Sequence, residues 1–260
     1  MTELESDGVI HASGIKTVPE KLKQDAIVEA LLEIRFDSQT IPEILLGRLA
    51  DHSAWNNFHQ RRLPISEIPA VVRQSDRNLR YSPWLELADL ERNRKVRIGE
   101  HVLSYHQLAP YPGWQVFRGQ LFETIDGLFS KAGKANIRRL GLRYINGLKP
   151  AVHRVDGILD LNMTVSVAGQ SIPESSNVNF TTNVHDDTDC TVRIAAADFV
   201  TGSLPEGTAV VIDVDVFTKP SARIKSAEDA KAWLEVAHTR EKEQFFRLLK
   251  PNTVQELMEK

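Results

Sequence analysis

Apolar and polar residues alternate with a period of two in three separate stretches of the chain. Over residues 27–37 (IVEALLEIRFD), five apolar side chains fall on one face and four charged ones on the other, and residues 137–145 and 210–217 repeat this pattern. A period of two over this length is typical of a strand with one buried face. The sequence therefore predicts three half-buried strands with charged outer sides.

The other segments predict shorter strands and several helices. The shorter strands are predicted at residues 58–63, 80–87, 160–167, 177–184 and 189–195, and in a hairpin over 95–107 that turns at Gly99 and Glu100. Helices are predicted at residues 42–50, 114–129, from Ser226 to Leu249 and at 253–258. Ser226 and Asp229 form a capping-box start, and Pro251 ends the long helix. Residues 66–77 stay unassigned, because Pro69 would interrupt a helix.

Each half of the chain thus begins with a long strand, continues through mainly antiparallel strands and closes with an amphipathic helix. This order predicts an α+β fold of two lobes, each a curved sheet packed by one helix. The expected division is an N-terminal tail over residues 1–24, a first lobe over 25–133 and a second lobe over 134–260. The two lobes share no residue-level repeat.

Composition and cysteine usage favour a cytoplasmic protein. Hydrophobic residues make up 42% and charged residues 26%, as in ordinary globular chains. The single cysteine, Cys190, excludes an intramolecular disulfide. An acidic N-terminus without a following apolar core argues against a secretory signal, and no apolar run reaches the roughly 18 residues of a membrane helix.

Charge is divided unevenly along the chain, although the net charge is only −3. Residues 61–149 hold 16 Lys and Arg against 8 Asp and Glu, whereas residues 151–217 hold 2 against 10. These opposite balances fit two regions that face each other or serve different partners. They also fit ordinary fluctuation of surface charge.

Motifs of the common enzyme and cofactor families are missing. The chain has no Gly-Lys-Ser/Thr phosphate loop, GxGxxG, HExxH, GxSxG or CxxC pair. We therefore predict no catalytic residue and no cofactor, and the sequence leaves a metal undetermined.

Charged residues on the predicted strands are the candidate ligand-binding residues: Glu29, Glu33, Arg35, Arg139, Arg143, Asp213 and Asp215. Asp213 and Asp215 share a face, and such a pair can hold a divalent metal or divide acid and base roles. The favoured interpretation is that they form cross-strand ion pairs with arginines. A third alternative is a small-ligand pocket between the lobes, lined by the glutamates and arginines.

Two smaller groups have both a functional and a structural interpretation. His185, Asp186, Asp187 and Asp189 could supply metal ligands, but aspartates are also the usual residues of hairpin turns. His238 and Glu241 lie one turn apart on the last helix and could ligate a metal or move a proton. A boundary histidine packed against the core is the favoured interpretation.

Arginines between residues 61 and 97 are interleaved with Tyr81 and Trp84. Arginine contacts to phosphate with aromatic stacking are typical of single-strand or RNA binding. The overall pI of about 6.3 and the lack of a nucleic-acid motif weigh against this function.

Three segments together resemble a sporadically distributed family of bacterial proteins of unknown function. They are Ala26–Phe36 (AIVEALLEIRF), Arg139–Asn146 (RLGLRYIN), and Val211–Phe217 with the helix that holds His238, Phe245, Phe246 and Leu249. The resemblance spans about Asp25 to Met258, and it departs at Gln24-Asp25-Ala26, where the family more often has a proline. It implies no activity and no catalytic residues.

A patchy distribution among bacteria is typical of toxin–antitoxin and phage-defence genes. We therefore expect a non-enzymatic binding protein that engages a protein partner, such as the product of the adjacent gene, and homo-oligomers are compatible with this role. The alternatives are a metal-dependent hydrolase or nuclease with paired aspartates, and a small-ligand-binding module.

Overall fold

The computed structural model describes residues 22–76 and 79–257, so most of the predicted N-terminal tail lies outside the described residues. The strands and helices are, in order, β1 (Ile27–Ser38), α1 (Pro42–Ala50), β2 (His59–Arg62), α2 (Ala70–Ser75), β3 (Leu85–Asp89), β4 (Arg94–Ile98), β5 (Val102–Leu108), α3 (Trp114–Lys131), β6 (Ala135–Leu148), α4 (Pro150–His153), β7 (Ser166–Val167), β8 (Gln170–Ser171), β9 (Asn177–His185), β10 (Thr188–Ala196), β11 (Val210–Thr218), α5 (Ala227–Leu248) and α6 (Pro251–Leu257).

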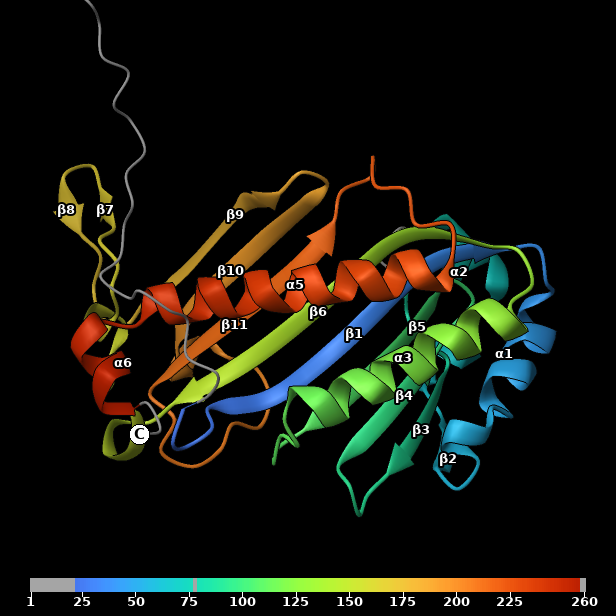
Figure 1. Ribbon diagram of the computed structural model, residues 1–260, viewed down its shortest axis with the longest axis horizontal. Coiled ribbons are helices and arrows are strands. Elements are labelled where there is room, and N and C mark those ends of the chain that lie inside the picture. The colour runs from blue at the N-terminus through green and yellow to red at the C-terminus, as the bar shows by residue number, and fades with distance from the viewer. Residues whose placement is uncertain (1–21, 77–78, 258–260) are drawn as a thin grey trace, which may run out of the picture.

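Nine of the described strands form one antiparallel sheet in the order β2-β3-β4-β5-β1-β6-β11-β10-β9 (Figure 1). Strand β1 illustrates how the alternation of apolar and polar residues matches the sheet. Ala30, Leu32, Ile34 and Phe36 are fully buried, whereas the residues between them face the other side. The predicted α+β class and the predicted strands at 27–37, 137–145 and 210–217 are confirmed.

The two halves of the chain repeat the same arrangement. In the first half β1 lies innermost, followed outward by β5, β4 and β3, and in the second half β6 is followed by β11, β10 and β9. Each half then closes with a long helix, α3 or α5. Because β1 pairs with β6, the strands of both halves form one sheet instead of the two separate sheets expected, and their buried side chains form one hydrophobic cluster. The predicted boundary at residue 133 falls between α3 and β6.

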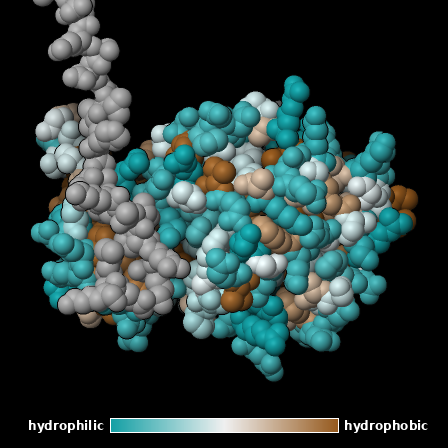
Figure 2. Space-filling model, in the orientation of Figure 1, coloured by the Kyte–Doolittle hydropathy of each residue, from teal (hydrophilic) through white to brown (hydrophobic). Residues whose placement is uncertain are grey.

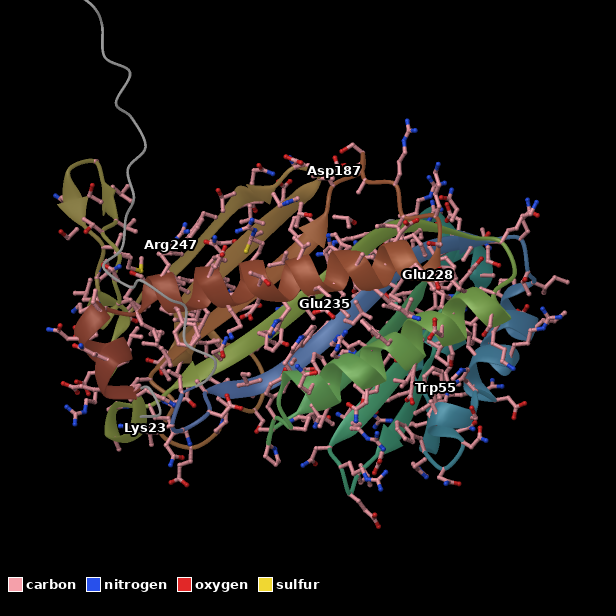
Figure 3. All side chains as sticks on the ribbon, in the orientation of Figure 1. Lys23, Trp55, Asp187, Glu228, Glu235 and Arg247 are labelled. Atoms are coloured by element: carbon pink, nitrogen blue, oxygen red, sulfur yellow. The ribbon has the colours of Figure 1, made fainter. Side chains whose placement is uncertain are left out.

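Helices α3 and α5 cover one face of the sheet and contact each other along their sides (Figure 1). Trp114 stacks on His238, Arg118 pairs with Glu235, and Asp126 pairs with Lys231 at 2.5 Å. Glu235 lies on the side of α5 that faces α3 (Figure 3). The outer surface of this layer is mostly hydrophilic, with small separate hydrophobic patches (Figure 2). These contacts hold α3 and α5 together over the sheet.

Two segments differ from their predictions for identifiable reasons. Residues 160–167 alternate like a strand, but only Ser166–Val167 pairs, because Asn162 is held by the end of α5 through a 2.7 Å bond from its N–H to the Leu248 carbonyl. In the unassigned segment 66–77, Pro69 precedes α2 as its N-cap and so starts the helix instead of breaking it.

None of the helices in the described part of the chain combines the length and the apolarity that a membrane span requires.

Candidate functional site

All seven charged candidates lie on the sheet face that α3 and α5 leave uncovered. They occupy the strand positions that alternate with the buried ones in β1, β6 and β11: Glu29, Glu33, Arg35, Arg139, Arg143, Asp213 and Asp215. The alternation placed each of them on the outward side of its strand, and the pairing of β1 with β6 and of β6 with β11 brings them onto one surface.

Ion pairs across neighbouring strands connect these residues. Arg139 donates to Glu33 at 3.0 Å and to Asp215 at 2.7 Å, and Arg143 donates to Asp213 at 2.7 Å. The predicted cross-strand ion pairs are confirmed. These arginines belong to the basic region of the sequence and the aspartates to the acidic one, so the two regions meet where β6 pairs with β11.

Electrostatics on this face follow from the pairing. Burial raises the pKa of the Asp215 carboxyl, although Arg139 and Arg143 oppose this shift. The hydrogen bonds that Arg143 donates to Asp213 raise the pKa of its guanidinium, against the effect of burial. Because arginines occupy both aspartates, the arrangement gives the paired-aspartate metal hypothesis no support. Among the described residues, no three His, Cys, Asp or Glu side chains are grouped to hold a metal ion.

The Asp-rich segment is a hairpin turn, as its favoured interpretation predicts. Asp187, labelled in Figure 3, accepts a hydrogen bond from Ser221, and the Asp186 carbonyl accepts one from Lys219. Thr188 beside this turn pairs with Thr218 at the end of β11, whereas Asp213 pairs with Arg193 farther along the strand. The turn and the aspartate pair are therefore separate features.

Gly141 explains how Arg139 reaches two carboxylates. It lies opposite Glu33 on β1 and Phe217 on β11. A Cβ atom at this position would collide with the Arg139 guanidinium, which lies over the glycine and over the Phe217 ring. The missing side chain thus provides the space in which the guanidinium lies across the sheet.

Replacing Gly141 by Ala is expected to displace this guanidinium and to lower the free energy of unfolding by about 1–3 kcal/mol, measured by urea denaturation. In an Arg139→Met background, the same glycine substitution should cost much less, because nothing remains to be displaced. An equal cost in both backgrounds would contradict this explanation.

Ser104, His106 and Glu29 form a hydrogen-bonded row on the same face. The Ser104 Oγ lies 2.8 Å from His106 Nε2, and His106 Nδ1 lies 2.6 Å from Glu29 Oε1. Burial acts to raise the pKa of Glu29, but the hydrogen bond and charge of His106 lower it overall. A serine nucleophile also needs donors for the oxyanion, and the backbone of this central strand is committed to pairing with β1 and β4. We therefore interpret this hydrogen-bonded row as a structural feature of the sheet face and not as a catalytic group.

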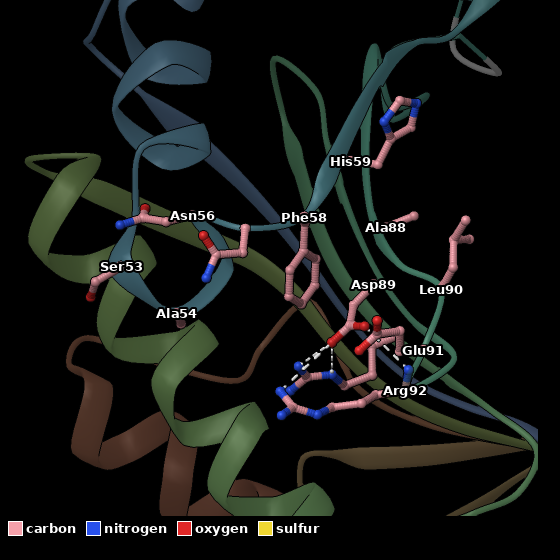
Figure 4. A pocket seen from close by; sticks show the side chains of 12 residues that line it. Ser53, Ala54, Asn56, Phe58, His59, Ala88, Asp89, Leu90, Glu91 and Arg92 are labelled. Atoms are coloured by element: carbon pink, nitrogen blue, oxygen red, sulfur yellow. Dashed lines mark hydrogen bonds and ion pairs between the residues drawn. The ribbon is translucent and has the colours of Figure 1, made fainter.

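The arginines of the predicted nucleic-acid surface are largely paired within the protein. Arg61 and Arg97 both bind the buried Glu86, at 2.7 and 2.8 Å. A hollow of about 510 Å³ between β2, β3 and the turn at residues 53–57 contains Asp89, which accepts hydrogen bonds from Arg92 and Arg94 (Figure 4). Asp89 and the two arginines of this hollow thus satisfy one another.

A second cavity, of about 580 Å³, lies on the helix-covered face where α3 begins, and we call it the interhelix cavity. It is bounded by the start of β1, the end of β6, the start of α3 and the C-terminal half of α5. Its walls are mainly aromatic and apolar, and the lining includes Leu22, Ala26, Ile27, Tyr111, Trp114, Tyr144, Asn146, His238, Glu241, Lys242, Phe245 and Phe246.

Glu241 is the distinctive group of this cavity. Its side chain lines the cavity and the residue is only 5% exposed. Within the described part of the chain, its carboxyl forms no hydrogen bond and no ion pair. Burial raises its pKa from 4.5 to about 8, although the charge of Lys242 acts against this. A buried carboxyl without a partner is costly to keep charged, so a structural role alone does not explain it.

Several aromatic rings line the cavity. Trp114 and His238 stack in parallel with 3.7 Å between ring centroids, which joins α3 to α5. Burial lowers the pKa of His238 to about 4, so its ring is neutral at physiological pH. The hydroxyls of Tyr111 and Tyr144 lie 3.0 Å apart, and burial raises the pKa of both.

Sequence reasoning identified His238 and Glu241 as a pair but not the cavity. Packing of His238 against other rings agrees with the favoured interpretation of a boundary histidine. Glu241 falls midway between Ala237 and Phe245, four residues from each, and so interrupts the apolar stripe of the helix. That interruption was the available signal. Nothing in the sequence marked Tyr111 and Asn146 as cavity residues, because only the fold brings them close to this helix.

No protein-family model and no curated protein matches the chain.

Proposed function

We propose that this protein binds a small organic molecule in the interhelix cavity. The observation that carries the proposal is the buried Glu241, whose carboxyl has no partner among the described residues, in a cavity lined by several aromatic rings. Small-molecule sites are typically concave, about 300–1,000 Å³ in volume and mainly apolar, with a few polar groups that fix orientation. The interhelix cavity has this size and this composition.

The alternatives have less support from the described residues. The charged sheet face consists of groups that neutralise one another, and the hollow beside β2 contains a carboxylate already held by two arginines. The interhelix cavity combines a concave shape with a buried carboxyl that lacks a partner among the described residues. An antitoxin-like or phage-defence role with a protein partner stays a prediction, and a small-molecule site is compatible with it.

A screen of small metabolites by thermal shift, followed by calorimetry, tests the proposal. A ligand present at about 100 times its Kd should raise the Tm by several degrees. Trp114→Ala removes one wall of the cavity and should weaken binding about tenfold or more. Phe199→Ala truncates an exposed aromatic residue elsewhere and should leave binding unchanged. A screen without hits, or equal affinity in both variants, would count against the proposed function.

A further inference from the structure

Two cationic side chains, Lys23 and Lys242, line the interhelix cavity together with Glu241, and neither forms a hydrogen bond or ion pair with its carboxyl in the described part of the chain. His238 on the same helix is neutral, as described above. Lys23, which lines the cavity and is labelled in Figure 3, donates a hydrogen bond from its ammonium to the Glu256 carbonyl at 3.0 Å. Asp25 is acidic and accepts a hydrogen bond from the Ile27 N–H. Lys242 follows Glu241 in the chain, and its charge lowers the Glu241 pKa only in part.

The other walls also favour positive charge in the cavity. Tyr111, Tyr144 and Trp114 present aromatic rings, and Phe245 adds another. The face of an aromatic ring carries partial negative charge and attracts ammonium and guanidinium groups. A bare divalent metal would need several oxygen or nitrogen ligands, and no such group of three exists among the described side chains. An anionic ligand would be repelled by the ionised Glu241 carboxyl.

We infer that the ligand of the interhelix cavity is an organic cation, an amine whose ammonium group pairs with the Glu241 carboxylate and packs against the surrounding aromatic rings. This inference rests on the proposed function and specifies its substrate class. The cation would be the partner that the Glu241 carboxyl lacks among the described residues. The aromatic rings would replace the hydration shell of the cation.

Binding of such a cation should depend on pH and release a proton. Below about pH 8 the Glu241 carboxyl of the free protein is protonated, so a non-titrating cation must displace that proton. Its affinity should rise close to tenfold for each pH unit between about pH 6 and 7.5 and level off above pH 8. Tyr111, Tyr144 and His238 stay neutral over this range.

Four probes of similar shape test the inference on the full chain: benzyltrimethylammonium, benzylammonium, benzyl alcohol and benzoate. Calorimetry at pH 8 should show both cations binding at least about tenfold more tightly than benzyl alcohol, and benzoate should bind least. Glu241→Gln, which keeps the shape of the side chain, should remove this preference and leave the affinity for benzyl alcohol unchanged. Repeating the titration at pH 7 in buffers of different ionisation enthalpy should reveal uptake of close to one proton by the buffer.

The outcomes separate the inference from the proposed function. If benzyl alcohol or benzoate binds as tightly as the cations, or if Glu241→Gln keeps the preference for cations, the organic-cation inference is wrong while the cavity remains a ligand site. If none of the probes binds and the metabolite screen also gives no ligand, both are wrong. Circular dichroism and the Tm of Glu241→Gln establish that the variant is folded.

Discussion

Replacing Glu241 by Gln is expected to stabilise the ligand-free protein at alkaline pH, by about 3–5 kcal/mol near pH 9. The carboxyl has a folded-state pKa of about 8 against an ordinary value of 4.5. A raised carboxyl pKa contributes stability that is complete below about pH 4.5 and is lost as the pH rises to about 8. Gln cannot ionise, so the variant avoids this loss.

His238 also makes the free energy of unfolding depend on pH, but in the opposite direction to Glu241. Its pKa falls from 6.5 to about 4 on folding, so its contribution is complete above pH 6.5 and is lost as the pH falls toward 4. Between pH 4.5 and 6.5 the two residues therefore act in opposite directions, and between pH 6.5 and 8 only Glu241 acts. In the wild type, stability should fall by about 2 kcal/mol over this upper range, and in Glu241→Gln that decrease should disappear.

Urea denaturation at half-unit pH steps measures this difference. Glu206→Gln makes the same substitution at an exposed position and should run parallel to the wild type at every pH. If the difference between Glu241→Gln and the wild type does not grow with pH, the carboxyl is ionised at neutral pH and is not held in an apolar setting.

Arg139→Ala is expected to lower the free energy of unfolding at pH 7 by about 2–3 kcal/mol. The guanidinium is 19% exposed and bridges Glu33 and Asp215, so its loss leaves Asp215 partly buried beside a second carboxylate. The partial exposure of all three side chains keeps the expected cost below that of a fully buried pair.

Asp215→Asn in the Arg139→Ala background should recover part of the lost stability, because the uncompensated charge is then removed. The deficit of Arg139→Ala should also shrink in acid, where Asp215 is protonated. Arg193→Ala, a change of the same kind at a more exposed site on β10, should cost less than 1 kcal/mol. Chemical denaturation of the wild type, Arg139→Ala, Asp215→Asn and the double variant gives the coupling between Arg139 and Asp215 directly, and a coupling near zero would show that the bridge contributes nothing.

Much of the sheet could be predicted because its strands have one buried, apolar face and one charged face. In β1, β6 and β11 the alternation specified both the strand and the side that is buried, and so it also placed Arg139 and Asp215 on the outward sides of β6 and β11. Residues 160–167 alternate equally well but are bound by the end of α5, a tertiary contact that no local pattern contains.

The candidate site was harder to predict from the sequence, because it too depends on tertiary contacts. Glu241 interrupts an apolar stripe and was visible as an anomaly, but the cavity exists only because Tyr111, Tyr144 and Asn146 reach the same helix from other elements. Joining of the two halves into one sheet was also missed, since the pairing of β1 with β6 depends on a contact between distant parts of the chain.

That pairing has a consequence for synthesis of the protein on the ribosome. Leu32 pairs with Leu142, so the inner edge of β1 stays without its neighbour until translation has passed β6. An unpaired strand edge is a template for pairing with other chains. The nascent first half should therefore be prone to aggregate, and the exposed edge of β1 should be covered once β6 has left the exit tunnel.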